Sequence, residues 1–398
     1  MLRTSVRPEN IPVEPDPDNA GVGKPGLDTI LFRFAKGFPM GKKRRIGIIS
    51  TIVKASSIIL FILFFASCGK AKVPADSGIK NSGGNNNEGN NGLVIWTYDS
   101  FVSEWGPGSS VSEAFEKNSG IKINWVSHGD AGEMLSRLLL EGDKAGADII
   151  LGLDQNLAGR ALNSGLLEAY KPQGAANIFP ELVIDPSFTL IPFDYSYFAI
   201  VYDSEKLPAP PACLEDLTDP KYKKSLILMD PRTSSPGLGF LGWTKEVYGT
   251  AWQDYWRRLT PSILTIAEGW DSGYGLFVKG EAPMVLSYTT SPGYHLENEH
   301  TERYRAAIFS DGHPMQIEVA GLLRAARNKA NAKRFLDFML SADFENIIPL
   351  TNWMYPVIDI PLPDSFRINP KSDKPLKPEP VSESDLNEWA SLMSSIPQ

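Results

Sequence analysis

From residue 93 onward the chain alternates short apolar runs with amphipathic segments, and this pattern limits the fold more than any other feature. The runs 93–98, 121–126 and 147–151 have the length and residue types of buried strands. The segments between them, 110–119 and 132–142, space their apolar residues as helices do. Strands that alternate with helices predict parallel sheets flanked by helices, so we expect an α/β fold.

Later segments extend this pattern and indicate more than one core. The aromatic-rich run 191–202 is long enough to cross between two lobes as one extended strand. Strands are also expected at 225–229, 284–288 and 316–323, and helices at 331–340 and 384–394. A folded region of about 300 residues exceeds what one simple core encloses, so we expect two lobes.

Two of the predicted strands end in similar turns, rich in Ser and Thr and continued by Ser-Pro. The turns are residues 230–237 and 289–293. Serine is a good N-cap and proline suits the first helical position, so Ser235-Pro236 and Ser291-Pro292 each predict a helix start. Unpaired N–H groups at such a start, beside small hydroxyls, suit phosphate or another anion. The two turns together predict a small polar ligand held by helix N-termini.

Aromatic residues gather near the ends of predicted strands, where ligands bind in open α/β sheets. They are Tyr98, Trp105, Trp270, Tyr288, Tyr294 and Trp353. Taken singly, each is more typical of a core or a rim than of a ligand contact. Together with the two turns, they predict a ligand that has a flat or cationic ring and an anionic or hydroxylated tail.

The charge balance and the cysteine count narrow the possible functions. The chain has 47 acidic and 39 basic side chains and a formal net charge of −8, which argues against a nucleic-acid partner and weakly favours a cationic ligand. Its two cysteines are Cys68 and Cys213, so no disulfide can form within the chain if Cys68 carries a lipid. The four histidines show no zinc-ligand spacing, and we expect neither a metal nor a cofactor.

The N-terminal region has the composition of an export signal. A basic run, 42–45, precedes an apolar stretch and small residues that end directly before Cys68, which is typical of secretory signals. This end resembles the lipobox of bacterial lipoproteins, in which the cysteine is lipidated, although Phe65 stands where that box has leucine. We interpret 40–67 as a lipoprotein signal peptide and Cys68 as the lipidation site. A transmembrane anchor at 46–66 is the alternative.

Two further N-terminal segments are expected to lie outside the folded domain. Residues 1–39 show no helical or strand period and Met40 stands where a signal peptide normally begins, so we interpret 1–39 as a mis-called extension. The run 68–92 is rich in Gly, Asn and Ser and predicts a flexible tether. A lipid anchor and a tether would hold the domain, residues 93–398, at a membrane surface in the periplasm or on the cell surface.

Seven sequence blocks, in the same order, resemble the periplasmic thiamine-binding proteins of ABC importers. Between about Leu93 and about Pro361 they are Trp96-Thr97-Tyr98-Asp99-Ser100-Phe101, Trp105-Gly106-Pro107-Gly108, Gly152-Leu153-Asp154-Gln155-Asn156, Pro192-Phe193-Asp194-Tyr195, Asp230-Pro231-Arg232-Thr233-Ser234-Ser235-Pro236-Gly237, Ser287-Tyr288-Thr289-Thr290-Ser291-Pro292 and Asn352-Trp353-Met354-Tyr355-Pro356. The resemblance implies a type II periplasmic-binding fold of two α/β lobes, with crossing strands and the ligand cleft between the lobes. Lobe 1 would contain about 93–192 and 292–345, and lobe 2 about 193–291 with the C-terminal region.

The resemblance also implies a function and a set of ligand contacts. The chain would be a receptor and not an enzyme, and would pass thiamine or its phosphate esters to ABC permease and ATPase subunits. The aromatic contacts would be Trp105, Trp270, Tyr288, Tyr294 and Trp353, with Asp130 as a ligand-contacting carboxylate. Ala131 stands where the family has glycine. The hydroxyethyl or phosphate end would meet Ser234, Ser235, Thr289, Thr290 and Ser291, and Tyr98 and Asp99 lie in a matching block.

Other functions remain open on the same residues. A thiaminase-like enzyme would need a reactive cysteine in the cleft, and Cys213 lies in a proline-rich connection. A ferric-ion receptor would use paired tyrosines, for which Tyr195 and Tyr197 are the candidates. A phosphate or polyamine receptor could use both turns, but neither ligand explains so many aromatic residues. A structural surface lipoprotein is the last alternative.

Overall fold

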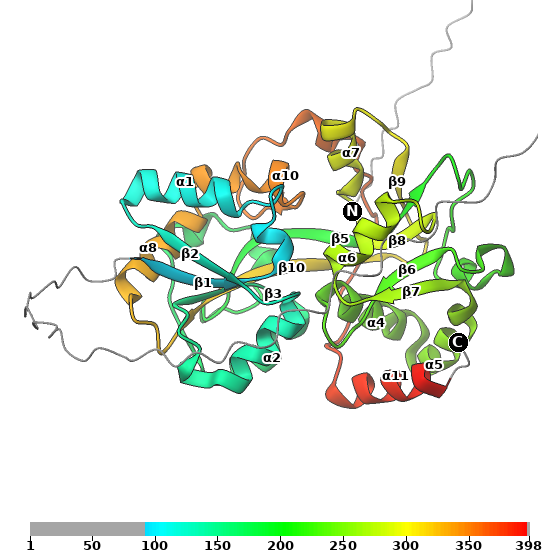
Figure 1. The fold of residues 1–398 in the computed structure, drawn as a ribbon, viewed down its shortest axis with the longest axis horizontal. Coiled ribbons are helices and arrows are strands. Elements are labelled where there is room, and N and C mark those ends of the chain that lie inside the picture. Colours follow the sequence, from blue (N-terminus) through cyan, green and yellow to red (C-terminus); the bar gives the residue numbers. More distant parts are fainter. Residues whose placement is uncertain (1–91, 396–398) are drawn as a thin grey trace, which may run out of the picture. The chain divides into compact units, whose positions relative to one another are not determined.

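Two long strands, β5 (Ile191–Asp203) and β10 (His313–Leu323), join the two lobes of the folded domain. The computed structural model of the chain describes residues 92–395. Figure 1 shows β5 and β10 running side by side from one lobe into the other. The first half of β5 pairs with β10 as far as Tyr197, and the second half pairs with β8 from Phe198 onward. One strand therefore belongs to both sheets.

Lobe 1 is built on a mixed sheet with the strand order β2-β1-β3-β10-β5. Strand β1 pairs in parallel with β2 and β3, whereas β10 is antiparallel to both of its neighbours. The elements of this lobe are β1 (Leu93–Thr97), β2 (Ile123–Ser127), β3 (Ile149–Asp154), β4 (Leu167–Glu168), β11 (Tyr355–Pro356), α1 (Gly108–Ser119), α2 (Ala131–Glu141), α3 (Gln155–Asn163), α8 (Lys329–Met339), α9 (Ala342–Glu345) and α10 (Ile348–Thr351).

Lobe 2 continues the sheet from β5 through β8, β6 and β7. Strand β6 pairs in parallel with β7 and β8, and β9 adds to the edge of β5. The elements are β6 (Leu226–Met229), β7 (Ile263–Ala267), β8 (Met284–Tyr288), β9 (Tyr304–Ala307), α4 (Ser235–Tyr248), α5 (Trp252–Leu259), α6 (Trp270–Val278), α7 (Ser291–Glu299) and α11 (Glu383–Ser395), with β12 (Pro375–Leu376) on β10.

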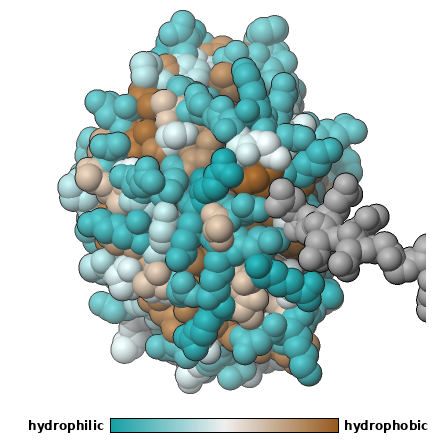
Figure 2. Space-filling view, turned by 90° about the vertical axis from the view of Figure 1, so that its left-hand side faces the viewer, coloured by the Kyte–Doolittle hydropathy of each residue, from teal (hydrophilic) through white to brown (hydrophobic). Residues whose placement is uncertain are grey.

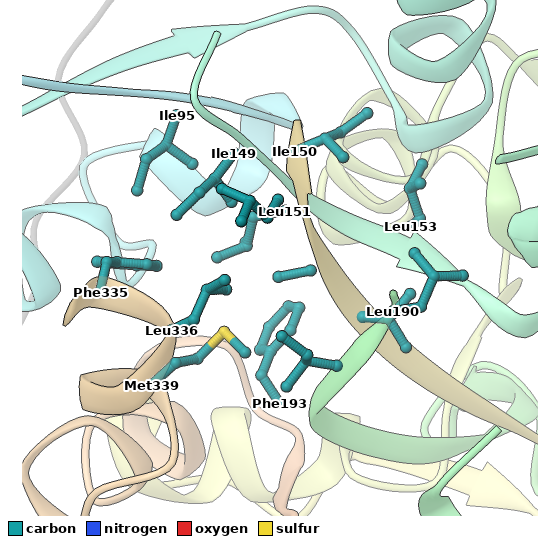
Figure 3. Close-up of a cluster of buried hydrophobic side chains, with 14 of the residues drawn as sticks. Ile95, Ile149, Ile150, Leu151, Leu153, Leu190, Phe193, Phe335, Leu336 and Met339 are labelled. Atoms are coloured by element: carbon teal, nitrogen blue, oxygen red, sulfur yellow. The ribbon is translucent and has the colours of Figure 1, made fainter. Parts of the chain in front are cut away.

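Each lobe encloses its own apolar core. Figure 3 shows part of the first, in which Ile95, Ile149 and Leu151 of the sheet lie near Phe335 and Met339 of α8. The second core is rich in aromatic residues, and it includes the fully buried Trp243 and Trp256. The predicted division into two lobes thus has a physical basis, because the buried apolar side chains form two clusters.

The lobe boundaries differ from the expected ones in two places. Tyr304 and Phe309, within the range 292–345 expected in lobe 1, pack in the second core because β9 pairs with β5. Ile348 and Val357, which the expected boundaries left to the C-terminal region of lobe 2, pack in the first core. The predicted strands and helices correspond to observed ones, with ends that shift by a few residues.

The helix starts after the two Ser-Pro turns are present, but their caps lie one residue earlier than predicted. Ser234 is the N-cap of α4 and Thr290 is the N-cap of α7, so Pro236 and Pro292 occupy the second helical position. Proline is tolerated there for the same reason as at the first position, since that N–H has no partner within the helix.

The N-terminal predictions fall outside the described residues. These are the extension 1–39, the signal peptide 40–67, the lipidation site Cys68 and the tether up to residue 91. Within residues 92–395 no helix has the length and apolarity needed to cross a membrane. Figure 2 shows the end of lobe 1, where hydrophilic residues cover most of the face and hydrophobic ones are scattered between them.

Candidate ligand-binding site

A cavity of about 490 Å³ lies where the two lobes meet. This volume falls in the range of roughly 300–1,000 Å³ that is usual for small-molecule sites. Lobe 1 contributes the end of β1 and the N-terminus of α2, and lobe 2 contributes the starts of α4, α6 and α7. Of the predicted site residues, the lining includes Tyr98, Asp99, Trp105, Asp130, Ser235, Trp270, Tyr288, Thr290, Ser291, Tyr294 and Trp353.

Trp270 anchors an aromatic wall of the cavity. Its ring stacks on Tyr274 with centroids 4.8 Å apart, and Trp105 from lobe 1 meets it edge-on at 5.9 Å. The indole Nε1 donates a 2.9 Å hydrogen bond to Ser287 Oγ, which fixes the plane of the ring. Trp105 is 41% exposed, so a large apolar face remains available at the mouth of the cavity.

Trp353 and Tyr294 form a second aromatic corner, with ring centroids 5.4 Å apart and nearly perpendicular planes. Trp353 stacks on Phe366, and its backbone has φ = 57°, in the left-handed region that non-glycine residues rarely occupy. Such strain persists only when the surrounding structure enforces it, and it is found most often at binding and active sites.

Asp130 is the point at which three helix N-termini converge. The aspartate is the N-cap of α2, and its Oδ1 accepts a 2.6 Å hydrogen bond from the Ala131 N–H and a longer one from the Ser235 N–H. Its Oδ2 accepts a 3.1 Å hydrogen bond from the Trp270 N–H in lobe 2. Burial raises the pKa of Asp130 above its usual value, and the hydrogen bonds from these helix starts oppose that rise.

Glu318 of β10 lines the cavity and belongs to a polar network. We call this network, which consists of Tyr98, Tyr288, Gln316 and Glu318, the floor of the cavity. The Tyr98 hydroxyl donates to Glu318 Oε2 at 2.7 Å, and Gln316 Nε2 donates to Glu318 Oε1 at 2.9 Å. The Tyr288 hydroxyl in turn donates to Gln316 Oε1 at 2.9 Å. Two lining tyrosines are therefore oriented by one crossing strand, Tyr98 by the buried Glu318 carboxyl and Tyr288 by the Gln316 amide.

Three predicted contacts do not line the cavity. Ala131 is buried in the first core, and its N–H donates a hydrogen bond to Asp130 Oδ1. Ser234 is buried as the cap of α4, beside Asp130, and faces a smaller cavity next to the C-terminal segment. Thr289 is 1% exposed, and its N–H donates to the Tyr197 carbonyl. These residues can support the site only through their neighbours, because they lie behind its surface.

Several lining residues were not predicted from the sequence. Among them are Glu133, Asp271, Lys279, Glu318, Asn352 and Met354. Asn352 and Met354 flank Trp353 in a block that had been identified, so adjacency alone pointed to them. Glu318 had a different signal, since it is a lone charged residue within an apolar strand.

The residues of the alternative functions lie elsewhere. Tyr195 and Tyr197 are not part of the cavity lining, and their rings contact each other with centroids 6.5 Å apart. In the described part of the chain, no three His, Cys, Asp or Glu side chains are grouped so as to hold a metal ion. Cys213 is also not among the lining residues, and burial raises the pKa of its thiol, which does not favour a nucleophilic thiolate.

Two α/β lobes, two crossing strands and a cavity between the lobes define a solute-binding receptor. Residues 145–383 match the family described as "Bacterial extracellular solute-binding protein", and the chain belongs to this family. Receptors of this family serve transport and are not enzymes. The predicted fold class is therefore confirmed.

Relatives within the family carry more specific names. The chain is 46% identical over 312 residues to the "Thiamine-binding periplasmic protein" of Brucella abortus, covering 76% of this chain and 92% of that protein. It is 43% identical over 278 residues to the protein of the same name from Escherichia coli, covering 69% of this chain and 83% of that one. The predicted resemblance is thus confirmed.

Solved structures agree with these sequence matches. A structure described as "Periplasmic thiamin binding protein" superimposes with a TM-score of 0.71 at 41% identity, and the match covers 76% of this chain and 94% of that one. A ferric binding protein from Campylobacter jejuni superimposes with a TM-score of 0.62 at 19% identity, covering 76% of this chain and 98% of that one. The second likeness shows only that the fold is shared.

Proposed function

We propose that this chain is an extracytoplasmic receptor that captures thiamine in the cavity between its lobes and delivers it to an ABC permease and ATPase. The cavity supports the proposal because aromatic rings of both lobes line it together with the carboxyl groups of Asp130 and Glu318. Thiamine has a cationic thiazolium ring and a flat pyrimidine, and both suit such surroundings. The relatives named for thiamine binding, at 42–46% identity, support the same ligand.

Several contacts have to act together to give tight binding. A cation over an aromatic face gains roughly 0.5–2 kcal/mol. A nanomolar dissociation constant corresponds to about −12 kcal/mol. No single ring supplies that free energy, so the aromatic wall, Asp130 and the floor must all engage as the lobes close.

Isothermal titration of the purified protein tests this function. The ligands are thiamine, its monophosphate and diphosphate, ferric ion and a polyamine. Saturable binding of thiamine without turnover supports the receptor and ranks its phosphate esters. Absence of heat with every thiamine compound, together with binding of ferric ion or the polyamine, overturns the ligand assignment.

We further propose that the receptor is a lipoprotein anchored to a membrane through Cys68. The basic run, the apolar stretch and the small residues before Cys68 support this anchor. In cells labelled with a radioactive fatty acid, the wild-type chain should carry label and remain with membranes. The variant Cys68→Ser should carry none, and equal labelling of both chains contradicts the proposal.

A further inference from the structure

Asp194 and Glu318 face each other where the crossing strands pair. They are direct partners in the antiparallel ladder between β5 and β10, so their side chains project from the same face of the sheet. Asp194 is fully buried and Glu318 is 6% exposed. Glu318 lines the cavity, and Asp194 is its ladder neighbour on the other crossing strand.

The hydrogen bonds of this pair leave one position unfilled. Both oxygens of Glu318 accept hydrogen bonds, from Tyr98 and from Gln316. Asp194 Oδ2 accepts a 2.6 Å hydrogen bond from Asn352 Nδ2, whereas Asp194 Oδ1 is buried and receives no donor from the described residues. As ladder partners on one face of the sheet, the Asp194 and Glu318 side chains lie beside each other. Two carboxyl groups can share a hydrogen bond only if one of them holds a proton.

In the part of the chain that the structure describes, no basic side chain neutralises the pair. The titratable groups around it are Asp130 at the start of α2, Asp154 at the end of β3, Glu345 of α9 and the hydroxyls of Tyr98 and Tyr288. Among residues 92–395, neither Asp194 nor Glu318 takes part in an ion pair with Lys, Arg or His. Burial raises the pKa of both carboxyls well above their ordinary values, and the nearby acidic groups raise them further.

We propose that Asp194 and Glu318 share one proton before the ligand binds and release it to the solvent when a cationic ligand enters the cavity. One positive charge enters as another leaves, so the charge enclosed at the floor stays constant. The ionised pair then attracts the cation, while a neutral ligand of the same shape gains no such attraction. The inference rests on the proposed binding of thiamine.

Linkage gives this exchange a measurable signature. If one proton is released for each ligand bound, the association constant rises about tenfold for each pH unit across the range in which the pair holds its proton. Glu318→Gln and Asp194→Asn remove the shared proton, and each should flatten this dependence. Asp185→Asn is the matched control, since Asp185 is also a buried carboxyl but neither lines the cavity nor belongs to the groups around the pair.

The experiment is titration with thiamine at one pH in two buffers, PIPES and Tris, whose ionisation enthalpies differ widely. For the wild-type protein the measured enthalpy should differ between the buffers by an amount that corresponds to about one released proton. The difference should vanish in Glu318→Gln and in Asp194→Asn and persist in Asp185→Asn. The wild-type measurement needs no variant, so misfolding of one variant leaves the test intact.

Each other outcome has a distinct meaning. Thiamine binding with the same enthalpy in both buffers overturns the proton exchange and leaves the receptor function standing. A buffer difference that persists in both pair variants also overturns it, because the proton then comes from another group. Absence of thiamine binding in either buffer overturns the proposed function itself.

Discussion

Asp130 and Trp270 meet across the cleft, where Oδ2 of the lobe 1 aspartate accepts a 3.1 Å hydrogen bond from the N–H that begins α6 in lobe 2. The sequence predicted that helix N-termini would hold an external anion. In the structure a carboxylate of the protein itself takes part of that role, because an N-terminal N–H attracts any negative charge within reach. The same bond links the two lobes, so it favours the closed arrangement.

Asp130→Asn should therefore weaken both closure and ligand binding. Hydrogen bonds to a charged group contribute about 1.5–3 kcal/mol, so we expect the affinity for thiamine to fall about tenfold or more. Titration measures the affinity, and small-angle scattering with and without ligand measures closure. Asp143→Asn, at an exposed position after α2, is the control and should change neither. Unaltered affinity in Asp130→Asn would show that the carboxylate charge plays no part.

Trp270→Ala should weaken thiamine binding at least tenfold, because it removes one face of the aromatic wall together with its contacts to Trp105 and Tyr274. Trp270→Phe keeps a ring but loses the hydrogen bond to Ser287, so its affinity should lie between those of wild type and Trp270→Ala. Titration of the three proteins gives this order. Equal affinities of Trp270→Ala and wild type would remove Trp270 from the site.

Trp353 provides a test of backbone strain. A side chain in the left-handed region costs roughly 1–2 kcal/mol, which glycine does not incur. We expect Trp353→Gly to have a higher Tm than Trp353→Ala, although both lose the stacking on Phe366. Ser136 is an exposed residue within α2 and serves as the control position. There Ser136→Ala should have a higher Tm than Ser136→Gly, since alanine is the better helix former. The same order at both positions would contradict strain at Trp353.

Asp154 should make stability fall as pH rises. Burial raises its pKa from the ordinary 3.8 to about 7, so the folded state binds a proton more tightly than the unfolded chain does. The free energy of unfolding therefore loses the contribution of this group between about pH 4 and pH 7. Asp154→Asn removes the proton but can keep the cap on α3 through its side-chain oxygen. The Tm of Asp154→Asn minus that of wild type should therefore be larger at pH 8 than at pH 5. An equal Tm difference at both pH values would contradict the raised pKa of Asp154.

The fold could be predicted well because its signals are local. The apolar run that became β3 and the Ser-Pro starts of α4 and α7 depend on neighbouring residues alone. The lobe boundary could not be placed as well, because β9 is assigned to lobe 2 only by its pairing with β5. Such pairing joins residues about 100 positions apart, and periodicity does not encode it.

The site was predictable to the extent that its residues stand at strand ends or in recognisable blocks. Thr289 and Ser234 belong to the right turns but point behind the surface, since successive side chains in a turn face different directions. Glu318 was missed because its partner Tyr98, which follows β1, meets it only after β1, β3 and β10 assemble. The left-handed backbone of Trp353 is likewise imposed by packing and has no sequence signal.

The shared strand β5 restricts how the two lobes can move. Sliding one lobe past the other would break ladder hydrogen bonds in both sheets, whereas rotation near Tyr197 and Phe198, where β5 changes partner, leaves both ladders intact. Rotation at this point is thus the motion that the shared strand permits, and one angle describes it. A membrane partner that grips both lobes would need to sense only that angle to distinguish a loaded receptor from an empty one.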